Sequence, residues 1–275
     1  MKFTKMHGAG NDFIIIDIDR ENIAVDDLPA IAKKLCERRL SVGADGLMAV
    51  TASSDGDFKM LFYNSDGTVG EMCGNGARCI ARYGYENGLA GVIQRIETAS
   101  GTVVGERISE RRYRVRMNDP TVIDLHRQVF TDGCVYDCSY IELGFPGLPH
   151  AVVELDFEKI PKDELFALGR KLRYDSAFPK GANVNFCHIT GENSVSAITY
   201  ERGVEDFTHA CGTGASSVAA ALALLGRVSG ENVKVNMPGG MLEISLTAEK
   251  GTAYDIFLTG PTNIVAVGEI TDEDL

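Results

Sequence analysis

Cys73-Gly74-Asn75-Gly76-Ala77 is the stretch that decides how this chain is organised, because it recurs as Cys211-Gly212-Thr213-Gly214-Ala215. Each copy leads from a cysteine through two glycines into an alanine-containing segment that is compatible with a helix, residues 77–85 and 215–225. Each copy therefore predicts a cysteine at the N-terminus of a helix. Two copies of one device predict a single site that is built from two halves.

A helix N-terminus is a reactive place for a cysteine. The first backbone N–H groups have no partner within the helix, and the helix dipole makes this end electropositive. A thiol there can have its pKa lowered, and a carboxylate can bind to the exposed N–H groups. Glycines leave space for that carboxylate because they carry no Cβ. A single Cys-Gly-x-Gly-Ala is also typical of a plain glycine-rich helix cap, so the duplication carries the argument.

The duplication extends along the chain with a nearly constant offset. A glycine-rich turn followed by an apolar strand occurs at residues 8–17 and 145–154, and long hairpins ending in Pro-Thr occur at residues 101–120 and 240–261. The remaining predicted elements are helices at 28–39 and 162–172, strands at 47–51, 58–63, 184–189 and 194–200, and a last strand at 264–269.

We therefore expect an α/β (α+β) fold of two pseudo-symmetric halves. The first half comprises residues 1–117 and 262–275, the second residues 118–261, and the last strand crosses back to complete the first half. The helix after each cysteine is apolar almost all round, so it has to be buried, most simply inside a curled, barrel-like sheet.

Composition narrows the class of protein. The chain has 275 residues, 44% of them hydrophobic, which is enough for real cores, and its net charge of −12 argues against nucleic-acid or anionic-membrane partners. The basic run at 111–116 alternates with Tyr113 and Val115, as in a solvated strand face. The first residues lack the apolar core of a signal peptide, and the longest apolar run, residues 218–225, is too short to span a membrane, so we expect a cytoplasmic protein.

The seven cysteines are scattered and contain no Cys-x-x-Cys pair, so they predict neither a disulfide framework nor a zinc site. Cys36, Cys79 and Cys187 lie in apolar contexts and are expected to be buried as small hydrophobic residues.

If the halves face one another, Cys73 and Cys211 confront each other across a bound small carboxylate. One thiol can then remove a proton from one face of a carbon while the other delivers a proton to the opposite face, which inverts the configuration. Backbone N–H groups would stabilise the charge that develops on the carboxylate. This chemistry needs no metal and no organic cofactor.

The motifs HGAGNDF (7–13), NSDGTVGEMCGNGARC (64–79), FPKGANVNF (178–186) and ERGVEDFTHACGTGAS (201–216) resemble the diaminopimelate epimerase family along the whole chain. The resemblance implies a cofactor-independent two-base epimerase with two similar halves, each a barrel-like sheet around a central helix. It implies interconversion of LL- and meso-diaminopimelate for lysine and peptidoglycan synthesis, in a cytoplasmic homodimer whose partner is a small amino-acid substrate.

The resemblance also implies roles for individual residues. Cys73 and Cys211 match the acid/base pair, and His150 and Glu201 match positions that support the thiols. Gly74, Asn75, Gly212 and Thr213 match the residues that hold the reacting carboxylate, while Asn11, Asn64, Asn183, Glu201 and Arg202 match the other substrate contacts. Arg202 can bind a distal carboxylate bidentately, and the amide oxygens of Asn64 and Asn183 can accept from an ammonium group.

Four positions depart from the family pattern: Leu148 replaces an asparagine, Phe207 and His209 replace a glutamate and a small apolar residue, and Gly46 replaces a common glutamine. Leu148 favours an alternative, a racemase or epimerase of another amino acid. A second alternative is a non-catalytic module that binds phosphate, although neither copy continues into the Gly-Lys-Ser/Thr of a P-loop. His150 could also be purely structural, and Glu201 and Arg202 could form a solvated turn.

Overall fold

The computed structural model describes residues 1–70, 73–271 and 273. Its contacts divide the chain into two compact units, Met1–Val115 with Thr259–Leu275 (unit 1) and Arg116–Leu258 (unit 2). The repeat in the sequence predicts breaks after residues 117 and 261. Two residues of the first cysteine motif, Glu71 and Met72, lie outside the described residues.

Unit 1 is one sheet in which neighbouring strands pair in the order β17, β1, β2, β3, β4, β5, β6, β7. The strands are β1 (Lys2–Gly8), β2 (Asn11–Asp17), β3 (Gly46–Thr51), β4 (Phe58–Asn64), β5 (Ile93–Thr98), β6 (Gly101–Arg107), β7 (Arg112–Arg116) and β17 (Asn263–Glu269). The helices are α1 (Ile18–Glu21), α2 (Leu28–Leu35) and α3 (Gly74–Glu86).

Strand β2 shows why this sheet is covered on both faces. Phe13 and Ile15 pack in the core that includes Ile80 of α3, while Ile14 and Ile16 pack in the core that includes α2. Successive side chains of a strand point to opposite faces, so an uninterrupted apolar run buries both of them. Helix α3 consequently lies on one face of the sheet and α2 on the other.

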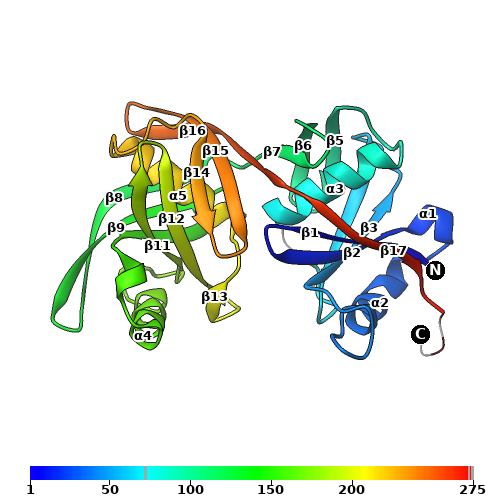
Figure 1. Cartoon of the computed structure of the whole chain (residues 1–275), viewed down its shortest axis with the longest axis horizontal. Coiled ribbons are helices and arrows are strands. Elements are labelled where there is room, and N and C mark those ends of the chain that lie inside the picture. Colours follow the sequence, from blue (N-terminus) through cyan, green and yellow to red (C-terminus); the bar gives the residue numbers. More distant parts are fainter. Residues whose placement is uncertain (71–72, 272, 274–275) are drawn as a thin grey trace. The chain divides into compact units, whose positions relative to one another are not determined.

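Unit 2 repeats the arrangement. Its strands are β8 (Pro120–Thr131), β9 (Cys134–Leu143), β10 (Leu148–Glu154), β11 (Asn183–Gly191), β12 (Ser194–Glu201), β13 (Asp206–Thr208), β14 (Val233–Met237), β15 (Gly240–Glu249) and β16 (Thr252–Pro261), and its helices are α4 (Lys162–Arg173) and α5 (Gly212–Leu224). Helix α5 contacts six of these strands and lies within their curl, whereas α4 lies against β8, β11 and β12 (Figure 1).

The strand pairings repeat as well as the elements. Strand β2 pairs parallel with β3 and β3 antiparallel with β4, just as β10 pairs parallel with β11 and β11 antiparallel with β12. Strand β17 pairs antiparallel with β1, and β8 pairs antiparallel with β9. The last strand of the chain therefore occupies in unit 1 the place that β8 occupies in unit 2.

The predicted helices and strands are confirmed, with three corrections. Helices α3 and α5 begin at Gly74 and Gly212, three residues before the predicted Ala77 and Ala215. Helix α2 ends at Leu35 instead of residue 39, because the chain turns there: Arg39 has a φ of 77° and Leu40 is 80% exposed. The run 111–116 was expected to form a solvated strand face, but in β7 Tyr113 and Val115 are fully buried, the arginines are half-buried, and Arg114 binds Glu106.

The predicted burial of three cysteines is confirmed, since Cys36, Cys79 and Cys187 are all in the core. Within the described part of the chain, every helix is either too short or too polar to cross a membrane.

Candidate active site

Both cysteines stand at helix N-termini, as the sequence predicts. Cys73 is the N-cap of α3 with φ −110° and ψ 117°, and Cys211 is the N-cap of α5 with φ −121° and ψ 110°. In both helices the cysteine carbonyl accepts the first helical hydrogen bond, from Ala77 N–H at 2.8 Å and from Ala215 N–H at 2.9 Å. The two motifs therefore build the same backbone device.

The thiol of Cys211 lies against donors of its own motif. Its Sγ accepts the backbone N–H of Gly214 at 3.4 Å and lies 3.4 Å from Oγ1 of Thr213. A hydrogen bond from a backbone N–H to sulfur favours the thiolate form of a cysteine. Cys211 is buried, whereas Cys73 is half-buried.

The second glycine of each motif serves packing instead of ligand access, which corrects the reason given above for these two positions. A Cβ on Gly76 would lie 2.0 Å from Cε of Met48. A Cβ on Gly214 would lie 2.4 Å from Oδ1 of Asn185 and 2.9 Å from Oγ1 of Thr199. Each helix thus begins close to the sheet beneath it, where a Cβ would meet the hydrogen-bonded pair Asn185 and Thr199 at Gly214 but only the flexible end of Met48 at Gly76.

In unit 1 the structure brings Asn11 and Asn75 together. The amide nitrogen of Asn75 donates to Oδ1 of Asn11 at 2.6 Å, and the amide nitrogen of Asn11 donates to Oδ2 of Asp45 at 3.1 Å. The third predicted amide, Asn64, ends β4 and donates to Oγ1 of Thr68 at 3.0 Å. Two of the predicted contacts of this unit therefore belong to one hydrogen-bonded chain.

Arg78 is a residue of this region that the sequence interpretation missed. Its side chain is fully buried beneath the first turn of α3, where it donates to the carbonyl of Gly74 at 3.1 Å and to Oδ1 of Asn75 at 2.8 Å. Burial lowers the pKa of its guanidinium to about 10. The signal was present, because Arg78 stands three residues after Asn75 and side chains at this spacing are neighbours on a helix.

In unit 2, His150 is held neutral. It is fully buried on β10, in register with Asn183 of the parallel strand β11. Burial, together with the nearby charge of Arg202, lowers its pKa to about 3, so the imidazole carries no charge at neutral pH.

The hydrogen bonds of His150 also define its tautomer. Nδ1 lies 3.2 Å from the amide nitrogen of Asn185, which can only donate, so Nδ1 accepts and Nε2 carries the proton. The amide of Asn185 is in turn oriented by Thr199, whose hydroxyl donates to Asn185 Oδ1 at 2.8 Å. Among the described residues, none forms a hydrogen bond with Nε2. This nitrogen is therefore a buried donor that a ligand can use.

Asn185 and Thr199 were also missed by the sequence interpretation. Both are fully buried polar residues within strands, Asn185 on β11 and Thr199 on β12. An asparagine buried within a strand needs hydrogen-bond partners, which is the signal that could have singled out Asn185.

Asn183 and Arg202 lie together at the ends of β11 and β12. Oδ1 of Asn183 accepts the backbone N–H of Arg202 at 2.8 Å, and its amide nitrogen donates to the Pro149 carbonyl at 3.2 Å. A ligand ammonium would therefore use the second lone pair of this oxygen. The guanidinium of Arg202 is half-buried and donates to the Lys180 carbonyl at 3.2 Å.

Glu201, the residue before Arg202, is half-buried at the end of β12. Its Oε2 accepts the hydroxyl proton of Thr208 at 2.8 Å.

The departures from the family pattern divide into three kinds. Phe207 packs among aromatic side chains, with ring centroids 5.8 Å from Tyr200 and 6.3 Å from Phe166 and Phe186, so it has a structural reason. His209 is exposed.

Gly46 is enforced by packing, because a Cβ there would lie 2.5 Å from the Phe62 ring and 2.7 Å from the Tyr63 carbonyl. Leu148 is half-buried at the start of β10, and nothing in the structure explains the leucine.

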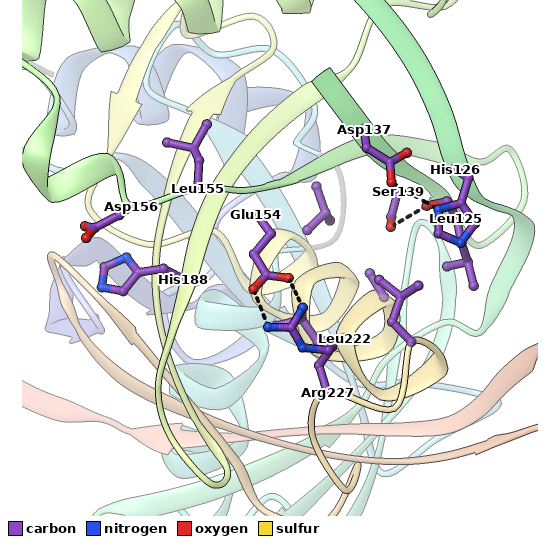
Figure 2. Close-up of a pocket in the computed structure, with 13 residues that line it drawn as sticks. Leu125, His126, Asp137, Ser139, Glu154, Leu155, Asp156, His188, Leu222 and Arg227 are labelled. Carbon is purple, nitrogen blue, oxygen red and sulfur yellow. Dashed lines mark hydrogen bonds and ion pairs between the residues drawn. The ribbon is translucent and has the colours of Figure 1, made fainter. Parts of the chain in front are cut away.

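A cavity of about 530 Å³ lies at the other end of α5, and none of the predicted site residues lines it. Its walls include Ala221 and Leu222 of that helix and Leu225, its C-cap. Figure 2 shows the paired charges at its edge, where Arg227 binds Glu154 through two hydrogen bonds of 2.8 and 2.9 Å. Across the described ranges, no group of three or more His, Cys, Asp or Glu side chains is arranged to hold a metal ion.

Comparison with known sequences agrees over nearly the whole chain. The model of the family described as diaminopimelate epimerase matches residues 3–123 and 145–265, one match for each copy of the repeat. A diaminopimelate epimerase of Archaeoglobus fulgidus is 40% identical over 265 residues, covering 92% of this chain and 91% of the relative. Another, from Methanothrix thermoacetophila, is 36% identical over 288 residues and covers 100% of this chain and 98% of the relative.

Solved structures share the fold at low sequence identity. A probable proline racemase from Agrobacterium radiobacter K84 has a TM-score of 0.72 at 16% identity, covering 99% of this chain and 93% of its own. A hydroxyproline epimerase from Agrobacterium vitis has a TM-score of 0.69 at 18% identity, covering 98% of this chain and 90% of its own. At such identities the likeness concerns the fold alone.

Proposed function

Because this chain belongs to the diaminopimelate epimerase family, we propose that it is an isomerase that converts LL-diaminopimelate to meso-diaminopimelate. The observation that carries the proposal is the pair of matched N-cap cysteines, Cys73 on α3 and Cys211 on α5. The full-length similarity to relatives of that name supports the choice of substrate.

Cys73 and Cys211 are the acid and the base of this proposal. One cysteine, as the thiolate, takes the α-proton, and the electron pair of the broken C–H bond remains on the substrate. The other, as the thiol, then gives its proton to the opposite face of the carbon. The two cysteines have exchanged protonation states at the end, so no oxidant, reductant or cofactor enters the balance.

The helix N-termini stabilise the intermediate. As the α-carbon loses its proton, negative charge moves onto the substrate carboxylate. Backbone N–H groups of Gly74, Asn75, Gly212 and Thr213 are the proposed donors to that carboxylate, and donors that are already oriented need no reorganisation as the charge forms. The buried setting of both first turns strengthens each of these hydrogen bonds.

His150 and Glu201 support the thiols from unit 2. A neutral His150 with its proton on Nε2 acts as a hydrogen-bond donor, and its low pKa makes it a poor proton acceptor at neutral pH. Arg202 binds the distal carboxylate, and Asn11, Asn64, Asn183 and Glu201 bind the remaining polar groups of the substrate.

We place this reaction in lysine and peptidoglycan synthesis, in the cytoplasm, with the enzyme a homodimer and the amino acid its ligand. The basis is the resemblance of the motifs, together with the absence of any membrane-spanning helix in the described chain. Light scattering of the purified protein at several concentrations measures the oligomeric state directly.

The experiment that tests the function is solvent deuterium exchange. The protein is incubated in D₂O with a panel of amino acids that includes LL- and meso-diaminopimelate, proline, hydroxyproline, lysine and glutamate, and α-deuterium is measured by mass spectrometry. We expect exchange and inversion with diaminopimelate only. Exchange into another amino acid alone would make the protein a racemase of that compound, and no exchange at all would leave a binding module.

A further inference from the structure

The buried guanidinium of Arg78 is a charge that the proposed mechanism does not use. All its recorded hydrogen bonds go to neutral acceptors, the Gly74 carbonyl and Oδ1 of Asn75, and its Nε is buried without a hydrogen bond in the described structure. Among the described residues no carboxylate binds it. A buried charge that lacks a counter-ion is strongly destabilising, so its retention points to an anion that is present in the working enzyme.

Among the described residues, the strands packed most closely against α3 supply no such anion. These strands are β1, β2 and β6, and on β1 the guanidinium abuts the backbone of Gly8, where a Cβ would lie 3.5 Å from Nη2. His7 lies on the opposite face of β1. The other charged side chains on these strands have partners elsewhere: Lys5 with Asp12, Asp12 with Arg38, Asp17 with Arg20, Glu106 with Arg114, and Arg107 over the ring of Tyr85.

Within the described part of the chain, the thiols of Cys73 and Cys79 are the groups that interact electrostatically with Arg78. Burial raises the pKa of Cys79 to about 12, so Cys79 stays protonated at neutral pH. Cys73 is the N-cap of α3, and the Arg78 side chain lies beneath the first turn of the same helix. Cys73 is also the proposed acid/base residue of unit 1.

We propose that Arg78 is a positioning residue of this site, whose buried charge stabilises the thiolate of Cys73 and whose hydrogen bond to Asn75 orients the amides that face the substrate. The proposal rests on the proposed function for the role of Cys73. It makes Cys73 the more acidic of the two thiols, and hence the resting thiolate.

The orienting role follows from which atoms can donate. A guanidinium has no acceptor, so Asn75 has to present Oδ1 to Arg78 and turn its amide nitrogen toward Oδ1 of Asn11. Asn11 is left with its own amide nitrogen directed at Asp45. One chain of hydrogen bonds thus runs from a buried cation to a carboxylate and permits a single orientation of both amides.

Unit 2 has no cation at the equivalent place. The offset of 138 between the cysteines aligns Arg78 with Ser216. The Ser216 hydroxyl donates to the carbonyl of Gly212 at 2.9 Å. This hydrogen bond is equivalent to the one from Arg78 to the Gly74 carbonyl, but its donor is neutral. The repeat therefore keeps the hydrogen bond under the first turn and differs in its electrostatics.

The test measures the acidity of each cysteine directly, without relying on turnover. The full-length protein is treated with iodoacetamide over a range of pH, and alkylation of the peptides that contain Cys73 and Cys211 is quantified by mass spectrometry. In the wild type we expect the midpoint of Cys73 to lie below that of Cys211. In Arg78→Met we expect it to rise by roughly one to three pH units, with the midpoint of Cys211 unchanged.

Two further variants separate charge from orientation. Arg78→Lys keeps a cation but loses the planar, two-point donor, so it should preserve most of the Cys73 midpoint and raise KM. Arg82→Met is the matched control, because Arg82 is a buried arginine one turn further along α3 that binds Glu86 and the Thr262 carbonyl. It should leave the Cys73 midpoint within a few tenths of a pH unit.

An unchanged Cys73 midpoint in Arg78→Met would overturn the proposal, even if the wild type epimerises diaminopimelate as expected. Conversely, the predicted shift could be observed in a protein that fails the deuterium-exchange test. If Arg78→Met does not fold by circular dichroism, the wild-type midpoints decide: a Cys73 midpoint equal to or above that of Cys211 contradicts the proposal, and one below it supports it.

Discussion

Helices α3 and α5 are both thirteen residues long, begin at a cysteine N-cap and are buried through most of their length. They differ in the polar side chains that surround their first turns. Beneath α3 lies the cation Arg78, hydrogen-bonded to Asn75. Beneath α5 lie neutral groups, Ser216 and the chain from Thr199 to Asn185. The two copies of the repeat share the backbone conformation at the cysteine N-cap but differ in the charge of the side chains at the first helical turn.

The difference matters for two-base chemistry. The proposed two-base mechanism needs one thiolate and one thiol at the start of each turnover, and identical surroundings would favour the same state for both. A buried cation on one side biases the protonation equilibrium by the electrostatic free energy of a nearby opposite charge. The two halves can therefore share one fold while their cysteines differ in acidity.

The largest expected effect tests whether both cysteines matter. Cys73→Ala and Cys211→Ala should each lower kcat by at least about 10²- to 10⁴-fold, because general acid–base catalysis contributes that much. Serine replacements should also be severely slowed, since a hydroxyl is a far weaker acid than a thiol and is not ionised at neutral pH. Epimerisation of LL-diaminopimelate is measured by chiral chromatography.

The control for this prediction is Cys134→Ala, which removes an exposed thiol of unit 2 and should keep wild-type rates. Near-normal turnover in Cys73→Ala or Cys211→Ala would contradict the prediction, because a single cysteine would then be enough for catalysis.

The next largest effect concerns Arg202, the half-buried cation of unit 2. Arg202→Ala should raise KM for diaminopimelate by about 10- to 100-fold, the loss expected for a hydrogen bond to a charged group, with a smaller change in kcat. Arg227→Ala is the matched control, because Arg227 pairs with Glu154 at the far end of α5 (Figure 2). Equal use of monocarboxylic amino acids by the wild type would mean that Arg202 binds no distal carboxylate.

Glycine substitutions sharpen the comparison at the level of stability. Gly214→Ala places a Cβ against Asn185 and Thr199. These two side chains are hydrogen-bonded to each other, so neither can move without the other. We therefore expect a loss of about 1–3 kcal/mol in the free energy of unfolding. Gly76→Ala meets only the flexible end of Met48 and should cost less. Urea unfolding of both variants measures the difference, and equal losses would contradict it.

A further effect on stability is a pH dependence from His150. Its folded pKa of about 3 lies below the ordinary 6.5, so between these values the unfolded chain binds one more proton than the folded protein. Stability from this group is complete above pH 6.5 and is lost as the pH falls, by about 1.4 kcal/mol per pH unit. His150→Gln should reduce the slope of the unfolding free energy by that amount between pH 4.5 and 6, and an unchanged slope would show that His150 protonates normally.

Much of the fold was predictable because the signals were local or periodic. The repeat located the two cysteine helices and their strands, and the apolar run that follows Asn11 predicted β2. The start of each helix was harder: it was expected at Ala77 and Ala215, but the glycines themselves are helical because the cysteine is the cap. The end of α2 was predicted four residues too late, because no sequence signal marks its C-cap, Cys36.

By itself the sequence determined the duplication, the fold class, the positions of Cys73 and Cys211 at helix N-termini and the family. These follow from the order and spacing of residues along one chain, which a repeat makes visible twice. Only the tertiary structure decided which polar side chains lie beneath each helix, because Arg78, Asn185 and Thr199 acquire their roles from burial and from hydrogen bonds to neighbouring turns and strands. The charge state of a buried group depends on everything within a few ångströms of it, and that neighbourhood exists only in the folded protein.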